Sequence, residues 1–123
     1  MTKAIITVLL LLISNVFMTL AWYGHLKMEE MGLLKKVGLW AIVLISWSLA
    51  LFEYIFQVPA NRMGFVGNGG PFTLFQLKII QEVLTLLVFV IFAKIAFKQM
   101  DLTINHFYAA LCMIGAVYFV FKK

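Results

Sequence analysis

Residues 4–24 read AIITVLLLLISNVFMTLAWYG, and this apolar stretch decides the fold. It carries no charged side chain, and about 20 such residues span a hydrocarbon core of about 30 Å as an α-helix. The stretch is longer than the apolar core of a signal peptide, about 7–15 residues, and no Ala-x-Ala cleavage site follows it. It ends in Trp22 and Tyr23, which are typical of a membrane interface. We therefore expect a first membrane-spanning helix.

Three further apolar stretches follow, at about residues 37–58, 72–97 and 102–121. Each is long enough to cross the bilayer once. We expect the second helix to stop before Pro59, because proline disfavours the α conformation in the residue that precedes it. The predicted fold is all-α: one transmembrane domain, residues 1–123, that forms an integral membrane four-helix bundle.

Three connections join the predicted helices. Residues 25–36 are rich in charge, and residues 60–71 contain four glycines, so we expect both segments to be loops. Residues 98–101 are predicted to form a tight connection. Because all three connections are short, neighbouring helices should be antiparallel and both termini should lie on one side of the membrane.

The composition supports a membrane protein over a soluble one. Of the 123 residues, 64% are hydrophobic and 12% are charged, whereas a soluble domain has about 45–50% and about 25%. Short alternating segments typical of a barrel are missing, which favours helices. The net charge is +5, but the cations flank apolar runs, so we expect lipid headgroups and no nucleic acid as their partners. The single cysteine, Cys112, and the absence of metal-ligand motifs predict no cofactor.

The positive charges are balanced between the two sides of the predicted bundle. The side of the termini holds Lys3, Arg62, Lys78, Lys122 and Lys123, and the other side holds Lys27, Lys35, Lys36, Lys94 and Lys98. The positive-inside rule then favours neither orientation. One interpretation is insertion in both orientations and an antiparallel homodimer. The other is a single orientation that one dominant loop fixes.

Two carboxylates fall inside the predicted spanning helices, Glu53 and Glu82. Such groups are expensive in a bilayer and usually face a bundle interior or an aqueous cavity. We expect both in the same half of the bilayer, together with Asn15 of the first helix, in one polar cavity. There a carboxylate could bind a proton or a cationic substrate in turn.

Each of these residues also has a structural interpretation. Lys78 lies four residues before Glu82 on the same helical face, so the two can form an ion pair. Arg62 could fold back toward Glu53 as its counter-ion. Asn15 could hydrogen-bond between helices, as amide side chains often do in membranes.

Trp47 and Tyr54 are seven residues apart and therefore share one stripe of the second helix. An aromatic wall beside Glu53 would attract organic cations through their rings. The structural alternative is ordinary packing. We assign His25 and His106, near the predicted interfaces, a structural role.

Three motifs resemble a poorly characterised bacterial family of four-helix proteins in the drug/metabolite transporter superfamily. They are NVFMTLAWYGHLK at 15–27, EYxxQVPANR at 53–62 and QLKIIQEV at 76–83, with Tyr118 and Phe119 near the end. The resemblance covers nearly the whole chain. It implies a small multi-pass protein of the bacterial inner (cytoplasmic) membrane, but it implies no substrate.

The small multidrug resistance transporters are more distant relatives in this resemblance. They are antiparallel dimers that exchange protons for cations, with an essential glutamate in the middle of the first helix. Asn15 stands at about that depth here, so the proton-coupling residue has no counterpart. If the mechanism survives, Glu53 or Glu82 must replace it.

We therefore expect a secondary transporter of a small organic solute, with a cation as the favoured class, that couples to protons and acts as a homodimer. Glu53 and Glu82 would bind proton or substrate, and Asn15, Trp47 and Tyr54 would line the cavity. The rival interpretation is a structural or accessory protein that binds another membrane protein. We expect no enzyme, because the sequence lacks a nucleophile–base or metal set.

Overall fold

The computed structural model describes residues 2–33, 35–97 and 102–122. Within these residues, four helical segments are long and apolar enough to cross a membrane, which confirms the all-α fold of four spanning helices. The predicted connection at residues 98–101 lies outside the described residues. The elements are α1 (Thr2–Thr19), the π-helix η1 (Leu20–Gly24), α2 (His25–Glu30), α3 (Leu39–Gly64), the short 3₁₀-helix η2 (Val66–Asn68), α4 (Leu74–Ala96) and α5 (Ile104–Phe121).

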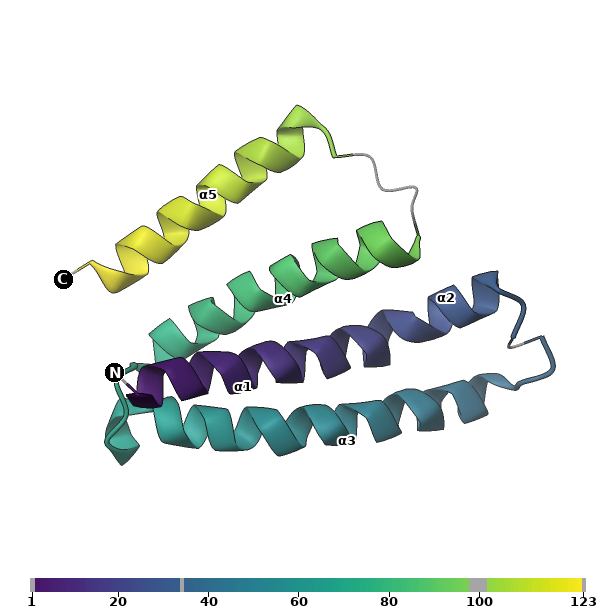
Figure 1. The fold of residues 1–123 in the computed structure, drawn as a ribbon, viewed down its shortest axis with the longest axis horizontal. Coiled ribbons are helices and arrows are strands. Elements are labelled where there is room, and N and C mark those ends of the chain that lie inside the picture. Colours follow the sequence, from purple (N-terminus) through teal and green to yellow (C-terminus); the bar gives the residue numbers. More distant parts are fainter. Residues whose placement is uncertain (1, 34, 98–101, 123) are drawn as a thin grey trace.

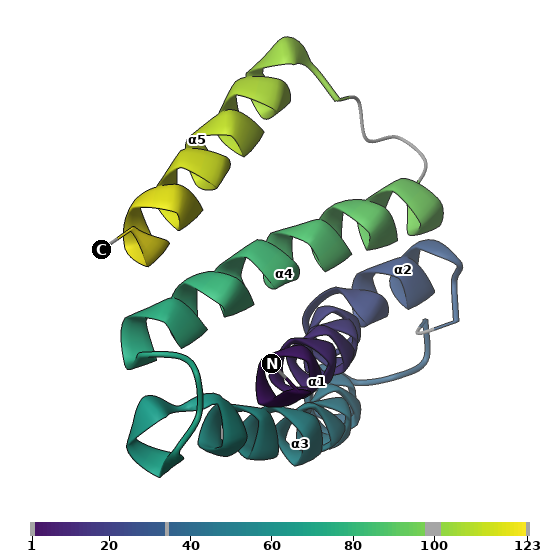
Figure 2. The same ribbon diagram turned by 60° about the vertical axis from the view of Figure 1, so that its left-hand side comes forward.

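The helices lie in the order α5, α4, α1, α3 in both views of the ribbon (Figures 1 and 2). Helix α1 packs against α3 on one flank and α4 on the other, while α5 packs against α4. Both chain termini lie at the same end of the bundle, as the sequence predicted (Figure 1). Helix α1 is therefore the central element, and α5 is the outermost.

The second spanning helix does not stop at Pro59, which corrects the sequence prediction. Helix α3 continues through the proline to Gly64. Lipid offers no hydrogen-bond partners to backbone N–H and C=O groups. The backbone on both sides of a proline in a membrane therefore keeps more hydrogen bonds by staying helical. The extension moves Glu53 toward the middle of the span, with fourteen residues back to Leu39 and eleven on to Gly64.

The first spanning helix also exceeds its predicted length. Residues 25–30, predicted as loop, form α2, and the segment Thr2–Glu30 runs as 29 consecutive helical residues. At 1.5 Å per residue this segment is about 43 Å long, well beyond a hydrocarbon core of about 30 Å. The charged residues of α2 can therefore reach the headgroup region without ending the helix.

The turn between α3 and α4 is held by local hydrogen bonds. Thr73 caps α4: its Oγ1 accepts from the backbone N–H of Gln76 at 3.2 Å, and its own N–H donates to Gln76 Oε1 at 3.0 Å. Gly70 must be glycine, because a Cβ there would lie 2.3 Å from the backbone carbon of Gly64. This turn fixes the end of α3 beside the start of α4.

Two contacts set the antiparallel register of α1 and α3. At the end of the bundle near the termini, a Cβ on Gly64 would lie 2.6 Å from Cγ2 of Thr7, so the helices approach closely there. Two turns further, Ser14 Oγ lies 3.5 Å from Gln57 Oε1. One more turn along both helices places Glu53 level with Met18.

We predict that Gly64→Ala lowers the free energy of unfolding by about 1–3 kcal/mol, because the added methyl group overpacks the contact with Thr7. The thermal midpoint in detergent measures the effect. Gly24→Ala is the matched control: its Cβ would meet no atom closer than 3.9 Å, so we expect its midpoint to be unchanged or higher. Adding Thr7→Ser should restore part of the loss, and equal midpoints for the two alanine variants would contradict the close contact.

Candidate functional site

Helix α1 carries most of the buried polar side chains among the described residues. Thr7, Ser14, Asn15 and Thr19 are buried on it, and Glu53 is buried on α3. The reason is the central position of α1, since it is covered on two flanks. Its polar residues therefore divide between two interfaces, one with α4 and one with α3.

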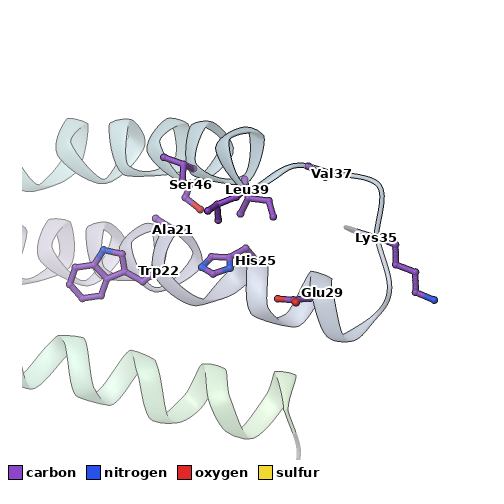
Figure 3. Close-up of a pocket in the computed structure, with 10 residues that line it drawn as sticks. Ala21, Trp22, His25, Glu29, Lys35, Val37, Leu39 and Ser46 are labelled. Carbon is purple, nitrogen blue, oxygen red and sulfur yellow. The ribbon is translucent and has the colours of Figure 1, made fainter.

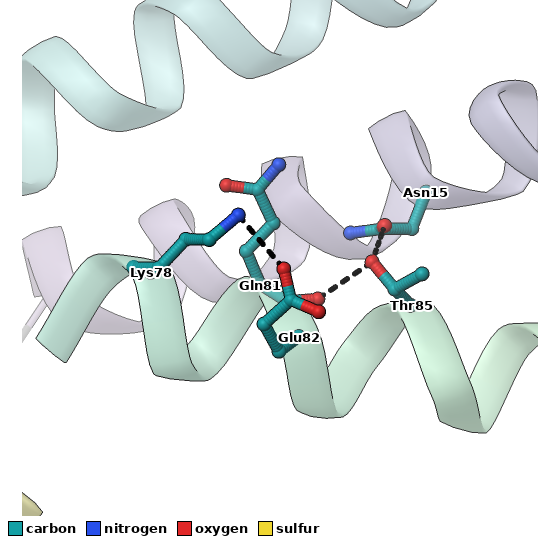
Figure 4. Close-up of polar contacts among 5 residues, drawn as sticks. All are labelled: Asn15, Lys78, Gln81, Glu82 and Thr85. Atoms are coloured by element: carbon teal, nitrogen blue, oxygen red, sulfur yellow. Dashed lines mark hydrogen bonds and ion pairs between the residues drawn. The ribbon is translucent and has the colours of Figure 1, made fainter. Parts of the chain in front are cut away.

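The interface of α1 with α4 contains a closed hydrogen-bond network (Figure 4). The Thr85 hydroxyl lies 2.5 Å from Asn15 Oδ1 and 2.7 Å from the carbonyl oxygen of Gln81, and it donates its single proton to one of them. Asn15 Nδ2 donates to the carbonyl oxygen of Leu11 at 2.7 Å. Asn15 thus joins α1 to α4, which is the structural role that the sequence left open for it.

The interface of α1 with α3 contains a carboxylate that has no partner. Glu53 is 0% exposed, and neither of its carboxylate oxygens has a hydrogen-bond partner among the described residues. Beside it, Phe17 of α1 stacks on Phe52 and Phe56 of α3, with ring centroids 5.7 Å apart in both pairs. The carboxylate is thus enclosed by the contact of α1 with α3.

Arg62 is not the counter-ion of Glu53. The ion pairs among the described residues join Lys27 to Glu30 and Lys78 to Glu82. Arg62 is exposed, two residues before the end of α3 and two and a half turns from Glu53 along the helix. The structural interpretation that relied on Arg62 is therefore wrong for this conformation of the chain.

Glu82 lies in a different environment from Glu53. Its Oε1 is 2.8 Å from Lys78 Nζ, one turn away on α4, and the two side chains are 50% and 65% exposed (Figure 4). The ion-pair contact that the spacing suggested does form. Neither of the two pockets described below is lined by Glu53 or Glu82. The three polar residues do not converge in one cavity, because α1 separates the interface with α3 from the interface with α4.

The two aromatic residues predicted beside Glu53 face outward. Trp47 is 64% exposed and Tyr54 is 54% exposed. Successive helical residues are about 100° apart, so Tyr54 points well away from the buried direction of Glu53. Within this chain they form no wall around the carboxylate; they face lipid or a neighbouring protein.

The larger of these two pockets lies elsewhere, between the end of the first spanning helix and the start of α3. It measures about 820 Å³, and we call it the α2–α3 pocket. Figure 3 shows His25 of α2 and Ser46 of α3 on facing helices, with Glu29 one turn beyond His25. Its lining residues are Ala21, Trp22, His25, Glu29, Lys35, Val37, Leu39, Ile42, Val43 and Ser46.

A π-helical segment borders this pocket. Residues Leu20–Gly24 form one wide turn between α1 and α2, and Ala21 and Trp22 of that turn line the pocket. Such turns insert an extra residue into a helix and often occur at functional sites. Here the turn places Trp22, His25 and Glu29 on one side of a continuous helix.

The sequence contained a signal for these pocket residues. Trp22, His25 and Glu29 have the spacing i, i+3, i+7, which puts them on one helical face. The shared face could not be recognised from the sequence, because residues 25–36 were predicted to form a loop and not a helix. His25, to which we assigned a structural role, also lines the α2–α3 pocket.

The family of the chain is evident from its match to a family model. A family described as "Putative member of DMT superfamily (DUF486)" matches residues 7–121. The chain belongs to this family. The match confirms the resemblance to the drug/metabolite transporter superfamily, and it spans Asn15, Glu53 and Glu82. Members of the superfamily are transporters rather than enzymes. Comparison with curated proteins and with solved structures gives no match.

The exposure of the Lys78–Glu82 pair leads to a stability prediction for this family member. We expect Glu82→Gln to lower the free energy of unfolding by no more than about 1 kcal/mol. Both side chains are at least half exposed, and Lys78 lies only four residues after the start of α4, where headgroups and water can solvate it without its partner. A loss of about 3–5 kcal/mol would instead indicate a pair buried away from water. Thermal midpoints of Glu82→Gln, Lys78→Gln and the double variant measure the pair, and its coupling energy should be a few tenths of a kcal/mol.

Proposed function

We propose that this chain is a secondary transporter of a small organic cation, that it exchanges its substrate for protons at Glu53, and that it acts as a homodimer in the inner membrane of a bacterium. The observation that supports the proposal most is the Glu53 carboxylate. It is fully buried at the middle of a spanning helix and has no partner among the described residues.

A buried carboxylate in a bilayer has three options. It can be neutral, it can reach water, or it can find a cation. The described residues supply no cation to Glu53. Water does not reach it in this conformation, since Glu53 is 0% exposed. A proton or a cation from beyond the described residues is left to satisfy it, and each excludes the other from the same oxygens. This competition is the elementary step of proton–cation exchange, and it needs only that both sides of the membrane reach Glu53 in turn.

The α2–α3 pocket is the access route that we assign to the substrate. Its lining ends at Ser46 of α3, which is seven residues before Glu53, two turns along the same helical face. Trp22 offers an aromatic ring for cation–π attraction. The Glu29 carboxylate attracts cations, but Lys35 in the same lining offsets its charge, so the aromatic ring is the main attraction for a cation here. The path from Ser46 to Glu53 follows the contact of α1 with α3, so the two helices must separate for a solute to pass.

Homodimerisation is supported by the open position of α5. No described residue of α5 is buried, and the helix packs mainly along α4, with Phe121 against Phe72 of the turn before α4 (Figures 1 and 2). Asn105, Cys112 and Phe119, spaced by seven, form an exposed stripe, and the neighbouring small pair Cys112 and Ala116 permits close helix approach. We propose that this stripe contacts a second copy, and that the balanced charges make the two copies antiparallel.

The rival function is that of an accessory membrane protein. The closed Asn15–Thr85 hydrogen bond and the Lys78–Glu82 pair support it, since both satisfy polar groups within the chain. In that case Glu53 would stay protonated and would serve no exchange. The two functions differ in whether Glu53 titrates when a ligand binds.

We predict that Glu53→Gln keeps the fold and abolishes proton-coupled binding. The amide has the shape of the acid without its charge, so the unfolding free energy should change by less than about 1 kcal/mol. The experiment begins with a thermal-shift screen of primary amines, quaternary ammonium ions and guanidinium ions in detergent. For each cation that shifts the midpoint, a pH indicator then measures proton release on addition.

The control for this experiment is Glu30→Gln, which removes a carboxylate from α2 that pairs with Lys27 and lines neither pocket. It should release protons like the parent. Proton release that persists in Glu53→Gln would refute the assignment of Glu53. If no cation in the panel shifts the midpoint and Glu53→Gln is as stable as the parent, the accessory function is favoured.

We predict that copies of the chain cross-link through α5 in an antiparallel arrangement. Cys112 lies near the middle of α5, so oxidation with copper phenanthroline in membranes should join two parental chains. In a Cys112→Ser background, Asn105→Cys alone should not cross-link, because the two ends of an antiparallel pair are far apart. The combination of Asn105→Cys with Phe119→Cys should restore the cross-link.

Cross-linking by Asn105→Cys alone would instead demonstrate a parallel pair. No cross-link with any of these variants would contradict an α5 interface. Reporter fusions at the C-terminus provide an independent check, since an antiparallel dimer requires activity on both sides of the membrane.

A further inference from the structure

We infer that a second pocket, between the end of α3 and the start of α4, binds the phosphate headgroup of an anionic phospholipid. This pocket measures about 290 Å³. Its lining combines polar residues, Asn61, Arg62, Asn68, Lys78 and Gln81, with the apolar Phe65, Leu74 and Leu77. We call it the basic pocket. It is distinct from Glu53 and from the α2–α3 pocket, so the inference does not depend on the proposed transport.

The place of the basic pocket in the fold is at headgroup depth. Arg62 lies two residues before the end of α3, and Lys78 lies four residues after the start of α4. At 1.5 Å per residue, both Cα atoms lie within about 6 Å of their helix ends. Both helices end at the side of the chain termini (Figure 1). A ligand held here would therefore sit where lipid phosphates lie.

The charge of the pocket selects an anion. Arg62 is exposed, and no carboxylate pairs with it among the described residues. Lys78 is paired with Glu82, which does not line the pocket, so the net charge contributed by Arg62, Lys78 and Glu82 is one positive. A guanidinium group binds a phosphate through two parallel N–H···O bonds, and Gln81 supplies a neutral donor beside it.

Two features favour a lipid over a soluble phosphate. Phe65, Leu74 and Leu77 form an apolar wall beside the cations, and an acyl chain can cover such a wall whereas an inorganic anion cannot. The pocket also lies beside the end of α3 and the start of α4, at the depth of the lipid phosphates. Basic pockets between membrane helices commonly bind anionic headgroups.

The test uses the full chain purified in detergent. Dioleoyl phosphatidylglycerol, dioleoyl phosphatidylcholine and inorganic phosphate are added separately, and the thermal midpoint and native mass spectra are recorded. We expect phosphatidylglycerol to raise the midpoint and to remain bound in the mass spectrum, with phosphatidylcholine weaker. Arg62→Gln should lower the apparent affinity for phosphatidylglycerol by about fivefold, the factor typical of one basic residue near a membrane surface.

A matched pair of variants tests whether the lipid binds in the basic pocket while both of its cations are kept. Leu74→Asp adds a negative charge inside the basic pocket, and Phe75→Asp adds the same charge one residue along, outside it. The two side chains are 71% and 66% exposed in the first turn of α4, where an acidic residue is tolerated. We expect Leu74→Asp to weaken phosphatidylglycerol binding and Phe75→Asp to leave it unchanged.

Each other outcome overturns the inference. Equal shifts by both lipids would indicate unspecific solvation by lipid. An equal shift by inorganic phosphate would assign the pocket to a soluble anion. Phosphatidylglycerol binding that survives both Arg62→Gln and Leu74→Asp would place the lipid elsewhere on the chain.

Discussion

The close contact between Thr7 of α1 and Gly64 of α3 sets the spacing on which the rest of the structure depends. A side chain at residue 64 would push the two helices apart, so this contact requires glycine. It also requires that α3 stays helical through Pro59, since Gly64 lies beyond the proline. From this contact the antiparallel register runs inward to the Ser14–Gln57 pair and then to Glu53, which the two helices enclose. The burial of the carboxylate is thus a consequence of backbone approach some sixteen ångströms away along α3, at 1.5 Å per residue.

The buried polar groups on the two flanks of α1 differ in whether they have hydrogen-bond partners within the chain. Toward α4, the Thr85 hydroxyl lies 2.5 Å from Asn15 Oδ1 and Asn15 Nδ2 donates to the carbonyl oxygen of Leu11, so these polar groups find partners within one chain. Toward α3, Glu53 has no such partner. Because an ionised carboxylate cannot persist there alone, the second interface is stable only while a proton or an external cation is present. A protein that needed only adhesion between α1 and α3 would fare better with an apolar residue at this position, since small residues and ordinary packing suffice to join membrane helices. Retaining an acid there fits a group that exchanges its partner.

Sequence reasoning predicted what depends on local pattern. Four apolar stretches gave four helices, and the i, i+4 spacing of Lys78 and Glu82 gave their ion pair. It failed where the membrane overrides a local rule. Proline often ends helices in water. In lipid, a break at Pro59 would leave further backbone groups without water to bind, so the helix continues past it. The sequence also could not show which side of a helix faces the other helices and which side faces outward. The spacing of Trp47 and Tyr54 showed that they share a stripe, but only the contact with α1 shows that this stripe points outward and that Glu53 points inward. The α2–α3 pocket was missed for a related reason, because treating residues 25–36 as a loop removed the helical face of Trp22, His25 and Glu29.

The open order of the helices gives the last constraint. A row in which α5 lies at one edge, packed mainly on α4, leaves one flank of α5 and one flank of α3 without extensive contacts among the described residues. Apolar residues on these flanks can face lipid. The charged pair of Lys78 and Glu82 on α4 cannot be satisfied by acyl chains alone, because both side chains are at least half exposed and lie at least one turn inside the helix. Charges at that depth need headgroups, water or a second protein surface. Arg62 and the basic pocket lie on the same side of the membrane, so anionic headgroups drawn to them would also be within reach of Lys78. The single chain therefore explains its own fold and the burial of Glu53, whereas its outer charges and the exposed α5 fit the bound lipid and the second copy that we propose.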